Sequence, residues 1–324
     1  MPSSELSPVE EDLKKWGPDA HESVSVDEAQ AICGRLVRRQ YENFSVLSSV
    51  VPRELREDFA AVYAYCRWAD DLGDELGDRA RALELLGWWR SELDACYEGE
   101  PRHPVFVALH PIIERHDLPR EPFDYLIDAF EQDQRVDRYE RWEDLVEYCR
   151  LSANPVGRLV LMLFGEERAA TSDVVKRSDE LCTALQLTNH WQDVRRDLEE
   201  RGRIYVPRTL MRSGGGTSEA FEERLIGTVR QGYAVDDTFL DESRRVIRAC
   251  VQQTWPLYET GFELLERLSP RARPVIWLLV SGGARVLRTI ELWNHETVLH
   301  RPTLGRVARL SLVARAWLQS RIKA

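Results

Sequence analysis

Two groups of acidic residues in this 324-residue sequence have the spacing that metal-dependent chemistry needs. The first is Asp70-Asp71-Leu72-Gly73-Asp74-Glu75, which follows an apolar run that begins at Phe59. Helical steps of three or four residues from Phe59 arrive at Asp70 and Asp74, so on a helix both carboxylates continue the buried stripe. Buried anions of like charge require a cation, and a divalent metal that bridges to phosphate oxygens would supply it.

The second group lies in the segment from Gln186 to Asp197. Steps of four residues from Leu181 reach Asn189, Asp193 and Asp197, so an amide and two carboxylates extend the inner face of a helix. Carboxylate and amide oxygens are ligands for hard divalent cations. Together the two groups are expected to hold several Mg²⁺ ions across a central cavity.

Asp-x-x-x-Asp carries little information by itself, because most such pairs lie on solvated helix faces. The same pattern also occurs at Asp74/Asp78, Asp124/Asp128, Asp133/Asp137 and Asp237/Asp241. Asp124 and Asp128 are out of phase with the apolar residues around them, which predicts a surface pair. The two chosen groups differ because each extends an apolar stripe and because they occur together.

The charge balance excludes one class of partner. The chain has 44 basic and 55 acidic residues, a net charge of −11, which argues against binding to nucleic acid. An acidic protein still binds a diphosphate when divalent cations bridge its carboxylates to the phosphates. The six cysteines are scattered without a C-x-x-C pair, so we expect reduced thiols rather than a zinc site or disulfides.

Helices must position these groups, because helical periodicity runs through most of the chain and no alternating strand pattern competes with it. Ser25-Val26-Asp27-Glu28 is typical of a capping box that starts the first helix, and Pro52 opens the second. Further helical periods cover residues 80–97, 123–130, 145–164, 174–198, 221–233, 241–268, 273–293 and 304–322. With a loop over residues 207–218, the pattern predicts one all-α domain spanning residues 25–324.

The first 24 residues are predicted to be a disordered lead-in, because they are rich in Pro, Ser and Glu. They lack the basic start and apolar run of a signal peptide. The most apolar stretch, Val275 to Val280, is far shorter than the roughly 20 residues that span a bilayer. A cytoplasmic protein is expected.

Four segments resemble the squalene/phytoene synthase family, whose members are head-to-head condensing enzymes of the all-α isoprenoid synthase fold. The run from Tyr63 to Asp74 resembles the first aspartate-rich motif, and the run from Leu187 to Asp197 with residues 202–207 resembles the second motif and its trailing loop. Residues 148–157 resemble the family's Tyr-Cys helix, and residues 43–45 with 51–52 resemble its substrate-contacting N-terminal segment. The resemblance covers residues 25 to 300 and implies a single-domain helical bundle with a central cavity.

The resemblance also implies roles for individual residues. Mg²⁺ would be ligated by Asp70, Asp74, Asn189, Asp193 and Asp197. Substrate contacts are implied for Phe44, Ser45, Tyr63, Arg67, Asn154, Gln186, Asn189, Gln192, Arg203 and Tyr205. Tyr148 would lie near the leaving group or the carbocation. From the residues alone, Arg67 is equally a salt-bridge partner of nearby aspartates, Tyr148 a core aromatic and Tyr205 a loop anchor.

Several departures from the family pattern are informative. Gln192 stands where condensing members usually have Arg, His190-Trp191 replaces an aliphatic pair, and Ser152-Ala153-Asn154-Pro155 replaces a Val-Ala-Gly run. These features resemble the bacterial hydroxysqualene synthase branch of hopanoid biosynthesis. That branch ionises presqualene diphosphate with Mg²⁺ and quenches the rearranged cation with water, so NADPH is not expected. Asn154, His190 and Gln192 are candidates for positioning the water.

Two other functions stay open. One is head-to-head condensation of two prenyl diphosphates to presqualene diphosphate, squalene or phytoene. The remote one is a non-catalytic acidic helical adaptor. The expected partners are the isoprenoid diphosphate and a sister synthase or dehydrogenase of the same pathway, with no nucleic acid. The greasy substrate suggests at most peripheral contact with the inner face of the membrane.

Overall fold

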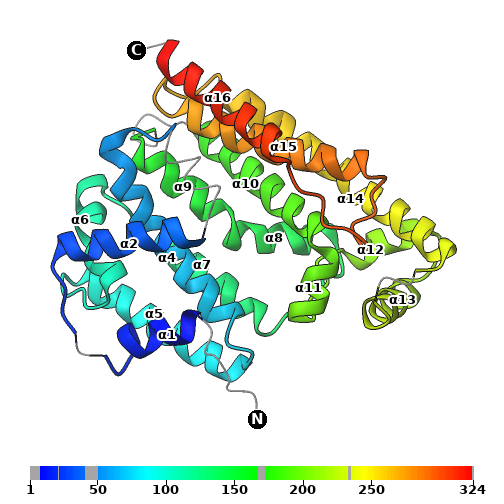
Figure 1. Ribbon diagram of the computed structural model, residues 1–324, viewed down its shortest axis with the longest axis horizontal. Helices are drawn as coiled ribbons and strands as arrows, with labels where there is room; N and C mark the ends of the chain where they lie inside the picture. The colour runs from blue at the N-terminus through cyan, green and yellow to red at the C-terminus, as the bar shows by residue number, and fades with distance from the viewer. Residues whose placement is uncertain (1–7, 21, 41–49, 167–171, 233–234, 323–324) are drawn as a thin grey trace. The chain divides into compact units, whose positions relative to one another are not determined.

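The computed structural model describes residues 8–20, 22–40, 50–166, 172–232 and 235–322 (Figure 1). Within these ranges the chain is helical, and its one β-type pairing is an isolated bridge between Arg138 and Ile204. The predicted all-α class is therefore confirmed. The chain forms two compact units, residues 1–135 with 158–169, and residues 136–157 with 170–324. The prediction of a single domain from residue 25 stays a prediction.

The first unit is built around α4, which packs against α2, α5, α6 and α7. Its helices are α1 (Pro8–Trp16), α2 (Val26–Gln40), η1 (Arg53–Leu55), α4 (Arg56–Asp74), α5 (Arg79–Tyr97), α6 (Pro104–His116) and α7 (Glu121–Asp133). Large aromatic side chains fill the core, among them the fully buried Tyr65, Trp89 and Phe106. The Tyr65 hydroxyl donates a hydrogen bond to the Phe123 carbonyl at 2.8 Å. This packing fixes the orientation of α4.

The start of α2 confirms the predicted capping box. The Ser25 amide donates to Glu28 Oε2 at 2.9 Å, and the Glu28 amide donates to Ser25 Oγ at 3.3 Å. The disordered lead-in does not hold for residues 8–16, which form α1. The buried Val9 gives α1 an apolar contact residue, and acidic residues in its first turn and lysines in its last complement the helix dipole.

Helix α6 was not predicted from the sequence. The helix buries Val105, Ala108, Leu109, Ile112 and Ile113, which have the spacing of an amphipathic stripe. Pro111 lies inside it, which argues against a helix on local grounds. Burial in the core of the first unit outweighs that signal.

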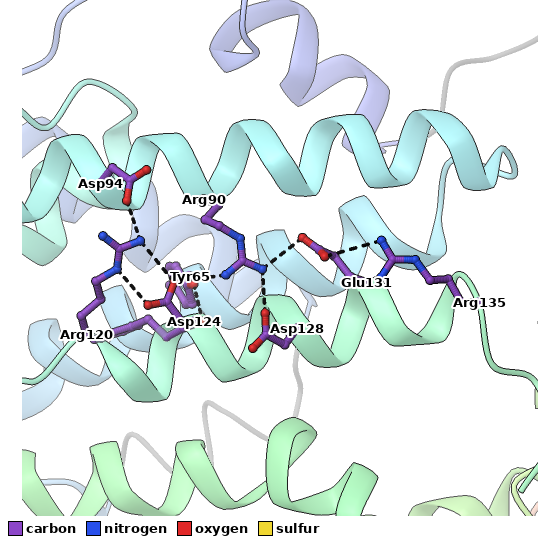
Figure 2. A network of polar contacts seen from close by, with 9 residues as sticks. Tyr65, Arg90, Asp94, Arg120, Asp124, Asp128, Glu131 and Arg135 are labelled. Carbon is purple, nitrogen blue, oxygen red and sulfur yellow. Dashed lines mark hydrogen bonds and ion pairs between the residues drawn. The ribbon is translucent and has the colours of Figure 1, made fainter.

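The pair Asp124 and Asp128 confirms the predicted surface assignment (Figure 2). Arg90 on α5 bonds Asp124 at 3.2 Å, Asp128 at 2.8 Å and Glu131 at 3.0 Å. Arg120 also bonds Asp124, at 2.8 Å. These carboxylates are partly exposed and are neutralised by arginines, as expected for a solvated helix face.

The second unit is built around α10, which packs against α8, α14 and α15. Its helices are α8 (Trp142–Ser152), the start of α9 (Asn154–Leu163), α10 (Ser172–Gln192), α11 (Val194–Arg201), α12 (Arg208–Met211), η3 (Arg212–Gly214), α13 (Ser218–Arg230), α14 (Asp237–Leu264), α15 (Arg273–Leu292) and α16 (Arg306–Ile322). Residues 158–163 of α9 belong to the first unit. Figure 1 shows α16 lying along α15. The largest contact within this unit joins α10 to α14, and it positions the second acidic segment.

Three predicted boundaries differ from the structure. The helix expected over 145–164 breaks at Ala153, two residues before Pro155, because proline cannot donate a helical hydrogen bond and its ring clashes with the carbonyl one turn earlier. The helix expected over 174–198 breaks at Asp193, between α10 and α11. The loop expected over 207–218 contains α12 and η3. No disulfide joins any of the six cysteines, all of which lie in described ranges, as predicted.

No helix in the described part of the chain combines the length and the apolar character that crossing a membrane requires.

Candidate functional site

The first acidic group lies at the C-terminal end of α4. Tyr63, Arg67, Asp70 and Asp74 are all half-buried and follow one another at helical spacing. The prediction that Asp70 and Asp74 continue the buried stripe is therefore wrong, because α4 packs its other sides against its neighbouring helices and leaves this side partly exposed. The buried carboxylate of this group is instead Asp71, which is 6% exposed.

Arg67 joins three of these carboxylates. Its guanidinium lies 2.9 Å from Asp70 Oδ2 and 2.8 Å from Glu75 Oε1, and it also pairs with Asp71. Burial lowers the pKa of Arg67, but the neighbouring carboxylates raise it more, so the net shift is upward and the side chain stays charged. Residues 70–75 thus bring four carboxylates to this end of α4, and carboxylate oxygens are donors of the kind that bind hard divalent cations.

The second acidic group lies where α10 ends and α11 begins. Asp193 is the residue between the two helices, with φ −106° and ψ 16°, and its side chain makes no capping bond. Instead it accepts hydrogen bonds from Arg301, one of them from Nη2 at 3.0 Å. Asp197, one turn further on, accepts a hydrogen bond from Arg201 Nη1 at 3.3 Å. Both carboxylates are mostly buried, with side chains 14% and 12% exposed.

Arg301 is the residue at this site that sequence reasoning missed. It lies between α15 and α16, 108 positions from Asp193. The next residue is also in contact, because the Gln192 side-chain amide donates a hydrogen bond to the Pro302 carbonyl. No local pattern could have found this pairing, since it depends on which distant segment the fold brings to the α10–α11 junction.

An aromatic group lies beside the second acidic group. The ring of His190 stacks on Tyr205 with centroids 3.8 Å apart and an interplanar angle of 19°. Tyr148 lies 5.7 Å from Tyr205 and 6.0 Å from His190. The Arg138–Ile204 bridge and the Ile204 amide bond to the Asp137 carbonyl hold the Tyr205 segment in place. The structure thus brings Tyr148 and Tyr205 together beside His190.

The three candidates for positioning water differ in their hydrogen bonding. Asn154 Oδ1 accepts from the Thr183 hydroxyl at 3.1 Å, and the Gln192 amide is bonded to Pro302. His190 is 5% exposed, and its Nε2 has no hydrogen-bond partner in the described part of the chain. Burial, with a smaller effect of Arg203, lowers the pKa of His190 to about 3. The imidazole is therefore neutral at physiological pH.

This buried histidine predicts a pH dependence of stability. Between pH 6.5 and about 3 the unfolded chain protonates His190 but the folded chain does not, so its contribution is complete above pH 6.5 and is lost as the pH falls. As the pH is lowered through this range, protonation of His190 in the unfolded chain should reduce the free energy of unfolding by up to about 1.4 kcal/mol per pH unit. Urea unfolding at pH 7.5, 6 and 5 should give a shallower acid slope for His190→Phe than for the wild type, and equal slopes would contradict the prediction.

The other predicted substrate residues lie as follows. Gln186 is half-buried on α10, and Asn189 is exposed, which differs from the inner position expected for it. Near its C-terminal end, α10 packs against its neighbouring helices through its other faces, and the face that carries Asn189 is exposed to solvent. Arg203 is 5% exposed and its amide donates to the Asp197 carbonyl at 3.1 Å. Phe44 and Ser45 lie outside the described residues.

The donors present fit Mg²⁺ in kind. Carboxylate oxygens one helical turn apart occur at Asp70 and Asp74 and again at Asp193 and Asp197, and Mg²⁺ is typically bound by one or two carboxylates together with substrate phosphates. Within the described ranges, no three His, Cys, Asp or Glu side chains gather as a metal site by themselves. The residues named would hold the ion only together with a phosphate-bearing ligand.

Comparison with known proteins gives a consistent result. The sequence model of the squalene/phytoene synthase family matches residues 37–310. Hydroxysqualene synthase from Zymomonas mobilis subsp. mobilis is 37% identical over 182 residues, which are 55% of this chain and 59% of that protein. Phytoene synthase from Thermus thermophilus is 30% identical over 287 residues, 89% of this chain and 92% of that one.

A solved structure agrees with these relatives. The crystal structure of squalene synthase HpnC from Alicyclobacillus acidocaldarius matches with a TM-score of 0.71 and 41% identity, covering 84% of this chain and 96% of that one. This match confirms the predicted isoprenoid synthase fold.

Proposed function

Because this chain belongs to the squalene/phytoene synthase family, we propose that it is a Mg²⁺-dependent hydroxysqualene synthase. It ionises presqualene diphosphate, rearranges the cation and captures water, releasing hydroxysqualene and pyrophosphate. The observation that carries this choice is the 37% identity to a hydroxysqualene synthase. The match spans only 59% of that protein's length, so the activity of this chain is a proposal that the assay below tests.

The acidic groups would bind the diphosphate through metal. Bound Mg²⁺ neutralises the charge that develops on the departing pyrophosphate. Asp70 and Asp74 would hold ions in the first acidic group, and Asp193 and Asp197 would hold ions in the second. Arg67 and Arg301 are paired with carboxylates of the two groups. Both guanidiniums would donate hydrogen bonds to the diphosphate.

The aromatic group would act on the carbocation and on water. The faces of Tyr148 and Tyr205 would stabilise positive charge, as would that of Tyr63 beside the first acidic group. His190 stays neutral, because burial lowers its pKa to about 3, and its Nε2 has no partner among the described residues. It therefore offers a hydrogen bond that orients one water molecule toward the cation, whereas the Asn154 and Gln192 side chains are already bonded.

A direct assay tests the proposal. Purified protein with Mg²⁺ is incubated with presqualene diphosphate and, separately, with farnesyl diphosphate, and the products are identified by mass spectrometry. We expect hydroxysqualene from presqualene diphosphate without NADPH, and no thirty-carbon product from farnesyl diphosphate alone. Conversion of farnesyl diphosphate to such a product would overturn the assignment. In the same assay, His190→Phe should lower the share of hydroxylated product.

A second candidate has an observation of its own. The phytoene synthase from Thermus thermophilus matches 89% of this chain, a longer stretch than the hydroxysqualene synthase match. It supports a condensing enzyme that joins two prenyl diphosphates head to head. The farnesyl diphosphate reaction, repeated with geranylgeranyl diphosphate and with NADPH, distinguishes this candidate from the first.

The proposed reaction also has neighbours. Presqualene diphosphate has to be supplied by a sister synthase that condenses two farnesyl units, and hydroxysqualene has to be consumed by an enzyme that removes its hydroxyl group. We propose both enzymes as pathway partners of this protein, and we propose a cytoplasmic location for it.

A further inference from the structure

The outward face of α16 is apolar. Val307, Leu310 and Leu318 are 82%, 66% and 51% exposed, and Trp317 is 40% exposed. Their spacing, together with the exposed Ala314, places them along one side of the helix. Among the described residues eight large apolar side chains are exposed, and these four are half of them. The exposed apolar surface is therefore concentrated on one helix.

The inward face of the same helix is apolar as well. Ala316 is fully buried, Leu312 and Val313 are half-buried, and α16 packs along α15 (Figure 1). A helix that is apolar on both sides is expected to be covered on both. In the described part of the second unit, α15 covers one side, and the apolar residues of the other side are exposed.

The charge of this region is opposite to that of the whole protein. Residues 297–324 contain six Lys or Arg and no Asp or Glu, whereas the chain has a net charge of −11. Arg306 and Arg315 are exposed beside the apolar face. Any partner that covers this face must therefore accept apolar side chains and carry negative charge at the same surface.

An anionic lipid bilayer has both properties in one plane. Its headgroups attract basic residues, Trp is favoured at the boundary between headgroups and acyl chains, and arginine stems lie along apolar surface while the guanidinium reaches the headgroups. A protein partner fits less well, because Arg306 and Arg315 flank the outward face on opposite sides, so a protein would need acidic groups on both sides of one apolar groove, whereas an anionic bilayer carries negative charge all around it.

We infer that α16 docks this protein on an anionic membrane surface, lying in the plane of the interface with its outward face immersed about 5–10 Å. Val307, Leu310, Trp317 and Leu318 enter the bilayer, and Arg306 and Arg315 contact lipid phosphates. This binding uses no residue of the acidic or aromatic groups, so it is independent of the proposed reaction.

Vesicle flotation without substrate tests the inference. The full chain is mixed with phosphatidylcholine vesicles or with vesicles that also contain phosphatidylglycerol. We expect flotation only with phosphatidylglycerol, weakened by salt because exposed charges are screened. The double variant Leu310→Glu and Leu318→Glu should partition at least about tenfold more weakly. The matched control, Leu292→Glu with Phe262→Glu, changes residues that are 72% and 41% exposed on α15 and α14 and should float like the wild type.

A further variant tests the charge separately. Arg306→Gln with Arg315→Gln should reduce the preference for phosphatidylglycerol while leaving the thermal unfolding curve unchanged, since both side chains are exposed. Wild-type protein that floats with neither vesicle would overturn the inference. So would an α16 double variant that keeps wild-type binding, or a control double variant that loses it equally.

Discussion

Replacing Asp193 by Asn should lower Mg²⁺-dependent turnover by roughly 10²- to 10⁴-fold. The substitution keeps the size of the side chain and one of its acceptor oxygens but removes the charge that would bind the cation. Arg301, the present partner of Asp193, is 48% exposed, so its lost ion pair should cost little stability. Asp70→Asn should have a similar effect, because its carboxylate belongs to the corresponding group on α4.

The control is Asp128→Asn, which changes the same Asp-x-x-x-Asp pattern in the arginine network of α5 and α7 (Figure 2). Its side chain is 45% exposed, and turnover should stay within about twofold of the wild type, a difference of less than 1 kcal/mol. Activity is measured across a Mg²⁺ titration, since a lost ligand raises the Mg²⁺ requirement as well as lowering the maximum. Equal activity of all three variants would favour the non-catalytic adaptor.

Gly283→Ala should destabilise the protein by about 1–3 kcal/mol, although alanine is the better helix former. Gly283 lies on α15, where an added Cβ would overlap Leu185 Cδ2 of α10 and the Tyr258 hydroxyl of α14. Leu185 has a flexible end, but Tyr258 is fully buried and its hydroxyl is 2.8 Å from that of Thr188. Relieving the overlap would disturb the packing that positions α10 and its polar residues.

The neighbouring glycine gives a matched control. An added Cβ at Gly282 meets nothing within 4 Å, so Gly282→Ala should stabilise the helix by about 0.5–1 kcal/mol. Chemical unfolding followed by circular dichroism measures both variants. A Gly283→Ala protein that is as stable as Gly282→Ala would show that α10, α14 and α15 can separate without cost.

The sequence alone determined the class of fold and which residues share one face of a helix. Helical periodicity gave the all-α class, the capping box at Ser25 is confirmed, and Asp70 and Asp74 lie on one side of α4. These features depend on residues three or four positions apart, because the helix repeats every 3.6 residues. The resemblance of the two acidic motifs to one family likewise used short strings of neighbouring residues, and the family was correct.

Only the tertiary structure decided which side chains are buried and which are partners. It buries Asp71 rather than Asp70, pairs Asp193 with Arg301, and stacks His190 on Tyr205. It also makes a helix of residues 104–116 although Pro111 opposes one. Each outcome depends on packing between segments that are distant in sequence, and the free energy of that packing exceeds local preference. Local pattern can fix the direction in which a side chain points from its helix, whereas the fold decides what that side chain meets.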